Sequence, residues 1–544
     1  MPVVRIELKR FSRMVGADQR RAVEGLPYLG LDIEGFDRNS VRVEYSPNRP
    51  DFGTDFGIAK ALRGLLGREV GLAHYAVRPS GVTVSVDRSL SSIRPYIACA
   101  TATGLTLDEE DVRQLISLQE DLHNGLGRRR AKAAIGLHDM KALTNQIEYK
   151  AVPHSFRFTP LDGKRQMNVS EVLSDTEQGK QYGKIVSRGR LFPMLTDSRG
   201  VVLSFPPVVN GNATKLTKKT KNVFIDVTGT HQRIVDDVLA ILATTMADIG
   251  AKIGSVVVKQ QKARRATPDL KVSEVPFDLT LVRDVTGLDL TRQQAVKCLE
   301  RSRFGVRGNT VLVPRYRLDI LHKVDISEEV ALGYGIEKIT PVYPPSNQPG
   351  VFNVFDQFLD KVSDIMAGSG MVELMTYELV DEDSLYGRFG RPSADRIAVE
   401  SPKSLEHSLL RDSLLPSLMG VLGRNAKEDY PQRVFEIGRV YTRTEGSASE
   451  AWHLGCLIAH SQASYTEAKT HLESLTRLIA GGEAETREAS HWAFAAGRSA
   501  VVRLGKAELG AVGEIKPEAL EAFGVKVPVS GFELDLTMLH KQLK

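Results

Sequence analysis

The spacing of apolar residues predicts short strands and amphipathic helices that alternate along the chain. Near the start, Ile58, Leu62, Leu65 and Leu66 recur at the spacing of one helical face, and Gly67 ends that helix. Two β-like runs and a turn with two prolines precede it, at residues 3–8, 41–45 and 46–51. We therefore expect a small N-terminal α+β domain over residues 1–76.

The same alternation continues over residues 77–265. Strands are predicted at 82–86, 97–103, 201–205 and 223–227, and helices at 109–125 and 232–249. The basic segment 259–267 ends before Pro268 and is interpreted as a linker. The pattern indicates a domain of mixed α/β structure.

Two further domains follow in the predicted order. Residues 266–345 combine helices at 291–301 and 325–334 with a strand at 311–313, which suits a winged-helix-like module. A proline-rich stretch then marks a boundary. Residues 346–544 are expected to form a large α+β domain, with helices at 352–367 and 414–425 and strands at 372–379 and 433–437. The whole chain is predicted to be an α+β multidomain protein.

The amino-acid composition excludes several classes of protein. The hydrophobic share of 42% permits a packed core in every domain and excludes bulk disorder. Cys99, Cys298 and Cys456 are too far apart in sequence for a disulfide framework or a zinc cluster, which fits a reducing compartment. The N-terminus has no signal-peptide pattern, and no apolar run is long enough to span a membrane. We expect a soluble, cytoplasmic protein that does not bind a membrane.

The formal net charge of +5 is small, but its distribution is uneven. Residues 121–150, 212–221 and 259–271 together carry +11, which leaves −6 for the rest of the chain. Concentrated positive charge is typical of a surface that binds a polyanion. Three solvated loops would give the same pattern. The candidate contacts are Arg128, Arg129, Arg130, Lys218, Lys219, Lys262, Arg264 and Arg265.

Four carboxylates gather at one predicted helix entry, namely Asp319, Asp325, Glu328 and Glu329. Their mutual repulsion is unfavourable unless something offsets it. Oxygen donors without His or Cys suit a hard cation, and Mg²⁺ is the commonest candidate. The alternative is a helix cap at Asp325 with glutamates that favour the first turn.

A second candidate is the strand that contains Asp226 and Thr228, which share a face two residues apart and follow the turn at 210–212. They could line a small polar pocket, or simply end a strand. The pair His138 and Asp139 is a weaker signal still. The sequence has no P-loop, GxSxG or HExxH motif, so those chemistries lack support.

Taken together and in order, these segments resemble a known family. The segments are SPNRPD at 46–51, Asn210-Gly211 with FIDVTGT at 224–230, RLDI at 317–320 through Glu329, SPK at 401–403, LRDSLLP at 410–416 and FEIG at 435–438. They resemble the β subunit of phenylalanyl-tRNA synthetase, of the archaeal and eukaryotic type, over essentially the whole chain. The chain ends soon after GFELDL at 531–536, without room for the additional C-terminal anticodon-binding domain of the bacterial type.

The resemblance implies a subunit of an α₂β₂ heterotetramer that joins phenylalanine to tRNA(Phe) with ATP and releases AMP and diphosphate. It implies that ATP and phenylalanine bind the α subunit, where the adenylate forms. The C-terminal domain would then be a class II synthetase-like antiparallel sheet without a catalytic site, which contacts the partner. The D-x5-D-x2-E-E pattern of the family's Mg²⁺ site matches Asp319, Asp325, Glu328 and Glu329, so the resemblance favours a structural metal there.

The resemblance also implies that residues 77–265 form an editing domain, which hydrolyses tyrosine wrongly attached to the tRNA. A pocket built for phenylalanine rejects an added hydroxyl only weakly, by ~10²-fold in comparable cases, so a second sieve is useful. The positions carried over are Leu203 as an apolar wall, Asp226 and Thr228 as polar partners, and Asn212, whose turn is harder to align. No nucleophile and base arrangement is evident, which favours water positioned by backbone and by the substrate's ribose hydroxyl.

Two other classes of function remain open at this stage. One is a non-catalytic tRNA-binding or editing protein that has no synthetase partner. The other is a Mg²⁺-dependent hydrolase or phosphotransferase that uses the four carboxylates. Association with an α subunit discriminates the first, and turnover by this chain alone discriminates the second.

Overall fold

The computed structural model describes residues 2–186, 189–261, 263–344, 348–393, 395–444 and 446–543. Contacts divide the chain into two compact units, residues 1–343 and 344–544, and each is described by itself. The expected boundary between residues 345 and 346 coincides with this division to within two residues.

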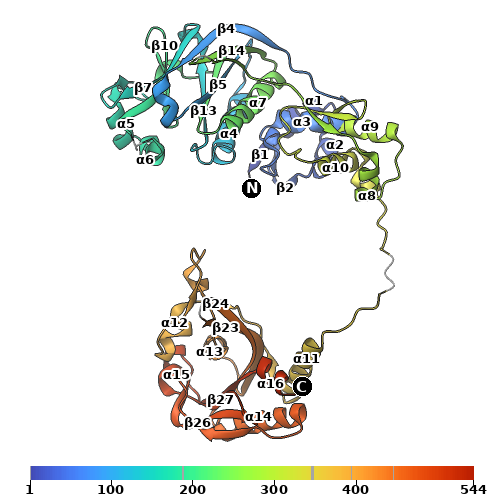
Figure 1. Cartoon of the computed structure of the whole chain (residues 1–544), viewed down its shortest axis with the longest axis vertical. Helices are drawn as coiled ribbons and strands as arrows, with labels where there is room; N and C mark the ends of the chain where they lie inside the picture. Colours follow the sequence, from blue (N-terminus) through green and yellow to red (C-terminus); the bar gives the residue numbers. More distant parts are fainter. Residues whose placement is uncertain are drawn as a thin grey trace. The chain divides into compact units, whose positions relative to one another are not determined.

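The N-terminal module is a three-stranded antiparallel sheet covered by helices (Figure 1). The strands are β1 (Val3–Glu7), β2 (Asp32–Phe36) and β3 (Ser40–Glu44), in the order β1-β3-β2, and the helices are α1 (Leu8–Val15), α2 (Gln19–Glu24) and α3 (Asp55–Leu65). Ile58 and Leu62 of α3 are fully buried against Phe11, as the predicted helical face requires. Thr54 caps α3 through the amide of Gly57.

The central part of this unit is a ten-stranded mixed sheet. Its order is β12-β11-β10-β7-β4-β14-β5-β13-β6, and β15 pairs with β14 off this path. The strands are β4 (Val77–Val86), β5 (Tyr96–Thr103), β6 (Ala133–Asp139), β7 (Gln146–Pro153), β10 (Leu191–Asp197), β11 (Val202–Phe205), β12 (Val209–Asn210), β13 (Asn222–Gly229), β14 (Lys252–Gln260) and β15 (Ala263–Thr267). Only the pairs of β4 with β14 and with β7 are parallel.

Two long helices, α4 (Glu109–Asn124) and α7 (Gln232–Asp248), cover one face of this sheet (Figure 1). Ile225 of β13 points toward them, whereas Phe224 and Asp226 point to the opposite face because strand side chains alternate. Toward the other end lie the short helices α5 (Val169–Asp175) and α6 (Glu177–Tyr182) and the two-stranded ladder of β8 (Arg157–Phe158) and β9 (Met167–Asn168). The sheet curls enough for β11 to contact β6, although these strands lie far apart in the order.

The expected linker at residues 259–267 is wrong. β14 runs through Gln260, and β15 returns antiparallel to it, with Lys259 opposite Arg264 and Val256 opposite Thr267. The hydroxyl of Thr267 donates to the carbonyl of Cys99 on β5, at 2.7 Å. This segment is therefore part of the sheet, and the sheet extends two residues beyond the expected boundary at 265.

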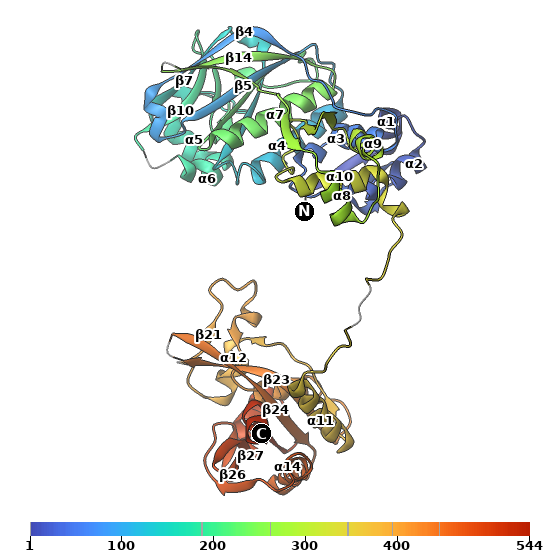
Figure 2. The same ribbon diagram turned by 45° about the vertical axis from the view of Figure 1, so that its right-hand side comes forward.

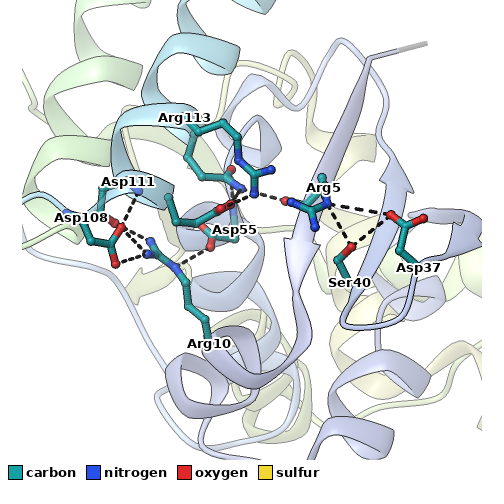
Figure 3. A network of polar contacts seen from close by, with 10 residues as sticks. Arg5, Arg10, Asp37, Ser40, Asp55, Asp108, Asp111 and Arg113 are labelled. Carbon is teal, nitrogen blue, oxygen red and sulfur yellow. Dashed lines mark hydrogen bonds and ion pairs between the residues drawn. The ribbon is translucent and has the colours of Figure 1, made fainter.

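A buried cluster of charges joins the N-terminal module to α4 (Figure 3). Arg10 of α1 donates to Asp55 at 2.9 Å, to Asp108 at 3.0 Å and to Asp111 at 2.5 Å. Asp108 and Asp111 also form the capping box that begins α4. One guanidinium thus holds α1, α3 and the start of α4 together.

The third module packs helices on a small antiparallel sheet of order β16-β18-β17. Its elements are β16 (Ser273–Pro276), α8 (Leu279–Thr286), α9 (Arg292–Arg301), β17 (Gly305–Arg307), β18 (Thr310–Val313) and α10 (Lys323–Tyr334). Both expected helices are present, and Thr291 and Gln294 form a capping box at α9. The module packs on α3, and the amide of Gly71 donates to the carbonyl of Glu300 at 2.7 Å.

The second unit is built on a seven-stranded sheet of order β19-β23-β24-β28-β27-β26-β25, antiparallel except for β19 with β23. Its strands are β19 (Val372–Glu373), β23 (Gln432–Thr444), β24 (Ser447–Ala459), β25 (Glu485–Glu488), β26 (Phe494–Leu504), β27 (Ala507–Ile515) and β28 (Val529–Asp535). The helices α11 (Val354–Gly368), α14 (Tyr465–Ala480) and α16 (Leu536–Gln542) pack on one face, and Figure 2 shows α11 and α14 beside the sheet.

The opposite face of that sheet carries α13 (Leu415–Arg424) and α15 (Pro517–Phe523). A small sheet of order β20-β22-β21 and the short helix α12 lie near its edge: β20 (Leu379–Val380), β21 (Ile397–Ala398), β22 (Leu409–Leu410) and α12 (Glu382–Leu385). The single strand expected at 372–379 is wrong, because only its two ends form ladders, β19 with β23 and β20 with β22.

Candidate functional site

A cavity of about 500 Å³ lies where the curled sheet brings its two ends together in the N-terminal unit. Gly136 of β6 and Asp226 of β13 line one side, and the segment from Ser204 to Asn210 lines the other. Helix α4 closes it with Gln119, Glu120 and other side chains. A volume of this size suits the side chain and backbone of one amino acid with part of its carrier.

Asp226 is the buried carboxylate in the wall of this cavity, which Glu120 and Asp162 also line, and its orientation is set by two buried side chains. It is 1% exposed, and its Oδ2 lies 2.7 Å from His138 Nε2. His138 Nδ1 lies 2.8 Å from the hydroxyl of Thr214. A Cβ at Gly136 would collide with both the Asp226 carboxylate and the His138 ring. The series of hydrogen bonds from Thr214 through His138 to Asp226 therefore requires glycine at position 136.

Thr228 shares the face of Asp226, as the strand pattern predicts, but it does not line the cavity. Its hydroxyl accepts from Arg94 Nε at 3.0 Å, and its carbonyl accepts from Arg94 Nη2 at 2.6 Å. Burial lowers the pKa of Arg94 to about 10. Thr228 thus supports a buried guanidinium behind the cavity.

Leu203 and Asn212 also lie outside the lining of the cavity. Leu203 is fully buried in the core on the Asp226 side of the sheet. Asn212 is exposed, and its side-chain oxygen accepts from the amide of Asp162 at 3.1 Å. Their neighbours Ser204 and Asn210 line the cavity instead, and the buried hydroxyl of Ser204 has no hydrogen-bond partner among the described residues.

Two further residues belong to this site: His138, which the sequence analysis gave only as a weak signal, and Arg130, which it gave as a candidate tRNA contact. His138 occupies a buried position in an otherwise apolar strand, and that interruption of the pattern was its signal. Arg130, expected on the tRNA-binding surface, donates to the carbonyl of Val208 at 3.2 Å and to Glu120 at 3.1 Å. Its guanidinium also lies 4.2 Å from the ring centre of Tyr182. It is therefore a wall of the cavity.

The remaining basic candidates differ in exposure and in whether their side chains form ion pairs. Arg128, Arg129, Lys219 and Arg264 are exposed. Lys218 pairs with Glu109 at 2.9 Å, and Arg265 pairs with Asp236 at 2.6 Å. Lys262 lies outside the described residues. The free side chains fit a polyanion surface better than the paired ones.

The four predicted carboxylates gather around one buried arginine. Arg317 donates to Asp319 at 2.9 and 2.6 Å and also contacts Glu329. Although burial acts in the opposite direction, the hydrogen bonds from Arg317 hold the pKa of Asp319 below its ordinary value. Asp319 also lies 4.0 Å from Arg49, so the SPNRPD and RLDI segments meet here.

Asp325 and Glu328 complete the cluster at the start of α10. Asp325 accepts from the amides of Leu321 and His322, each at 2.7 Å, as a helix cap does. The pKa of Glu328 is raised by partial burial and then by the charges of Glu329, Asp325 and Asp319. Within the described ranges, no group of three or more His, Cys, Asp or Glu side chains has the geometry of a metal site. Asp325 is thus the third residue of a capping box in which His322 is the N-cap.

Three family models match the chain in order. A B3/4 domain matches residues 106–244, a tRNA synthetase B5 domain matches 275–336, and the phenylalanyl tRNA synthetase beta chain CLM domain matches 339–536. A phenylalanine–tRNA ligase beta subunit from Archaeoglobus fulgidus is 38% identical over 99% of this chain and 98% of its own length. The chain belongs to the phenylalanine–tRNA ligase beta subunits.

Other relatives agree. The phenylalanine–tRNA ligase beta subunit of Methanosarcina barkeri is 35% identical over the full length of both chains. The crystal structure of an N-terminal fragment of the phenylalanyl-tRNA synthetase beta subunit from Pyrococcus horikoshii is 34% identical, with a TM-score of 0.60, and covers 61% of this chain and all of the fragment. The chain thus resembles archaeal members of the family over its full length, and the residues that line the cavity lie within the B3/4 match.

The CLM match contains the framework residues that the sequence singled out in the ligase subunit's second unit. Arg411 and Glu436 form a buried ion pair at 2.7 Å, and the hydroxyl of Thr376 donates to Glu436 at 2.7 Å. The pair ties β23 to the segment before α13. Of the described helices, none is long and apolar enough to cross a membrane.

Proposed function

We propose that the cavity beside Asp226 is the hydrolytic editing site of this ligase subunit, which removes tyrosine from tRNA(Phe). The observation that carries this proposal is one buried carboxylate in the wall of a cavity whose lining is polar and apolar in about equal measure. Tyrosine differs from phenylalanine by one hydroxyl, and a carboxylate accepts a hydrogen bond from that hydroxyl. Phenylalanine would leave this hydrogen bond unmade, which costs affinity.

The catalytic step follows from what the cavity contains. The imidazole of His138 is engaged by Asp226 and Thr214, so it orients the carboxylate and does not activate a nucleophile. Water that attacks the ester carbonyl would be held by backbone groups and by the ribose hydroxyl of the substrate. Arg130 fixes the carbonyl of Val208 on the opposite wall. The chain's own residues therefore bind and discriminate, and the substrate assists its own hydrolysis.

The variant Asp226→Asn tests this proposal, with Asp139→Asn on the neighbouring strand as the matched control. We expect Asp226→Asn to lower deacylation of Tyr-tRNA(Phe) by about tenfold or more, because a hydrogen bond to a charged group contributes about 1.5–3 kcal/mol. Phenylalanylation by the complex with the α subunit should stay unchanged. Normal deacylation by Asp226→Asn, or an equal loss in Asp139→Asn, would contradict the proposal.

We also propose that this chain assembles with an α subunit. The name of the relatives as beta subunits supports an α partner, and we propose the α₂β₂ heterotetramer in which the α subunit binds ATP and phenylalanine and forms the adenylate. Within it, Arg128, Arg129, Lys219 and Arg264 would contact the tRNA backbone, in the cytoplasm. A chain that stays monomeric on co-expression with an α subunit would support the alternative of an editing protein without a synthetase partner.

We further propose that Asp319, Asp325, Glu328 and Glu329 hold a structural Mg²⁺. The donor set fits a hard cation, and the pKa of Glu328 is raised by burial and then by the neighbouring carboxylates, whose repulsion a cation would relieve. Bound Mg²⁺ would supply positive charge beside four carboxylates, of which Arg317 pairs with Asp319 and Glu329. Glu328 is exposed, so Glu328→Gln tests binding without disturbing the core, and Glu337→Gln is the control.

We expect Mg²⁺ to raise the melting temperature of the parent protein and of Glu337→Gln, and to raise that of Glu328→Gln less. The same shift in all three proteins would contradict the assignment. Turnover of a phosphate ester by this chain alone, lost in Asp319→Asn, would instead support a Mg²⁺-dependent hydrolase.

A further inference from the structure

A second, larger cleft of about 820 Å³ lies in the N-terminal unit and shares no residue with the cavity beside Asp226. Helix α3, the segment 69–80, the end of α7 and the ends of β5 and β14 surround it. Its charged lining is Lys60, Arg63, Arg78, Lys252 and Arg303, against Glu69 and Asp248. The five basic and two acidic groups leave an excess of three positive charges.

Both acidic groups of this cleft are already paired. Asp248 accepts from Lys60 at 2.8 Å and from the Tyr75 hydroxyl at 3.0 Å. Glu69 lies between Arg63, at 2.8 Å, and Arg303, at 2.7 Å. These pairs leave Arg78 and Lys252 without a carboxylate partner among the described residues.

The floor of the cleft is one face of three adjacent strands. Gly254 of β14 lies opposite Arg78 of β4 and opposite Thr101 of β5, and Lys252 lies opposite Thr103. Residues paired across strands share a face, and alternate residues of one strand do too, so Arg78, Lys252 and Thr101 belong to one side of the sheet. The register thus places two cations around a small polar floor.

Thr101 is a buried polar group that opens only toward this cleft. It is 1% exposed and is one of the residues that line the cleft. A Cβ at Gly254 would collide with its hydroxyl, so glycine at this position leaves room for that group at the floor.

We propose that this cleft binds phosphate groups, with Arg78 and Lys252 as the charged contacts and the Thr101 hydroxyl as a donor. Guanidinium, ammonium and hydroxyl groups together match the oxygen-rich, negatively charged surface of a phosphate. The volume suits a ligand of nucleotide size. The phosphate belongs either to an RNA backbone or to a free nucleotide. The cavity beside Asp226 shares no lining residue with this cleft, and none of the described candidate tRNA contacts lines it.

The test uses the full-length chain with the double substitution Arg78→Gln and Lys252→Gln. Lys9→Gln with Arg38→Gln is the matched control, since it removes the same charge from two exposed side chains outside the described cavities. Binding of fluorescent tRNA(Phe) is measured by anisotropy over a salt series, and binding of ATP by calorimetry. We expect at least tenfold weaker binding of one probe, and a threefold or larger loss in the isosteric Thr101→Val.

The two probes separate the sources. Weaker tRNA binding, with a salt slope lower by about 2, identifies an RNA backbone, because each phosphate contact releases about one counterion. Weaker ATP binding with unchanged tRNA binding identifies a free nucleotide. Unchanged binding of both probes, or an equal loss in the control, would overturn the proposal. Circular dichroism confirms that each variant is folded, and Thr101→Val preserves the core volume if the double variant is not.

Discussion

Gly136 has no side chain, and the space beside it is occupied by the Asp226 carboxylate and the His138 ring. The absence of a side chain at this position therefore determines where a buried carboxylate lies. Its neighbour Ile135 faces the apolar core on the other side of β6, so the backbone cannot move away easily. Changes at this one position should affect the cavity beside Asp226 before they affect the rest of the sheet.

We predict that Gly136→Ala lowers deacylation of Tyr-tRNA(Phe) and destabilises the protein by about 1–3 kcal/mol, the usual range for overpacking. The added methyl must displace the His138–Asp226 pair. Deacylation assays and urea unfolding measure the two effects. Gly189→Ala, on an exposed turn where a Cβ meets only ordinary contacts, is the control. Full activity of Gly136→Ala would show that the pair is not needed.

At the same scale, the strand pattern and the family resemblance agreed on Asp226, and the structure places it in the wall of a cavity. Thr228 shares its face, but its partner Arg94 lies 134 residues away in sequence and cannot be read from local spacing. His138 was noticed and discounted, because a histidine in a strand is usually structural. Only the fold shows that its Nε2 lies within hydrogen-bonding distance of Asp226 Oδ2.

The junction of α1, α3 and α4 is an element held by buried charge. Asp55 of α3 is fully buried, and burial raises its pKa to about 6, although Arg10 acts to lower it. The nearby charges of Glu110 and Asp111 also raise it. The folded protein therefore holds a proton at this site more tightly than the unfolded chain.

We predict that the stability of the parent protein relative to Asp55→Asn falls as pH rises. The folded pKa exceeds the unfolded pKa, so the contribution is fully present below the unfolded pKa of 3.8 and is lost as pH rises through about 6. The full change is about 3 kcal/mol. Urea unfolding from about pH 3 to pH 7 measures it. If the stability of the parent relative to Asp55→Asn instead increased with pH, the ion pair with Arg10 would dominate over burial.

Elements with a strong local pattern were predicted well, and elements made by distant pairing were not. The helix at 291–301 follows from its capping box and its buried face. The strand at 263–267 has no apolar alternation, and it exists because β14 supplies its hydrogen bonds and Asp236 pairs with Arg265. Conversely, the segment 372–379 alternates like a strand, yet its middle has no partner strand.

At the scale of the whole molecule, that unpaired middle is an exposed apolar surface. Met375 is 97% exposed, and it lines a hollow of about 310 Å³ with Tyr377 and His407. Large apolar side chains that stand in solvent together mark an interaction surface. If the last domain contacts the proposed α partner, as the resemblance to the β subunits implies, we expect this surface to be part of the contact.

We predict that Met375→Lys with Tyr377→Lys weakens assembly with the α subunit by at least tenfold, since charges would be buried in an apolar contact. The isolated chain should unfold at the same urea concentration as the parent, because both side chains are exposed. Gel filtration of the co-expressed subunits measures assembly, and Lys403→Glu on the same unit is the control. Normal assembly would place the interface elsewhere.

The order of the domains along the chain could be read from the sequence, but their assembly into sites could not. The cavity beside Asp226 combines residues from α4, β6, the 204–210 segment and β13, and the larger cleft combines α3 with residues up to Arg303. Only the curl of the sheet and the packing of the third module bring them together.

The third module contacts the N-terminal part of the chain through the hydrogen bond from Gly71 to Glu300 and the ion pair of Arg303 with Glu69. These contacts cannot form until late in the synthesis of the chain. A ribosome makes the N-terminal module first, at about 5–20 residues per second, so more than ten seconds pass before its partner residues emerge. During that interval the exposed side of α3 has no cover. Nascent chains halted before residue 300 should therefore be far more accessible to proteases and chaperones at α3 than chains halted after residue 340 has left the exit tunnel.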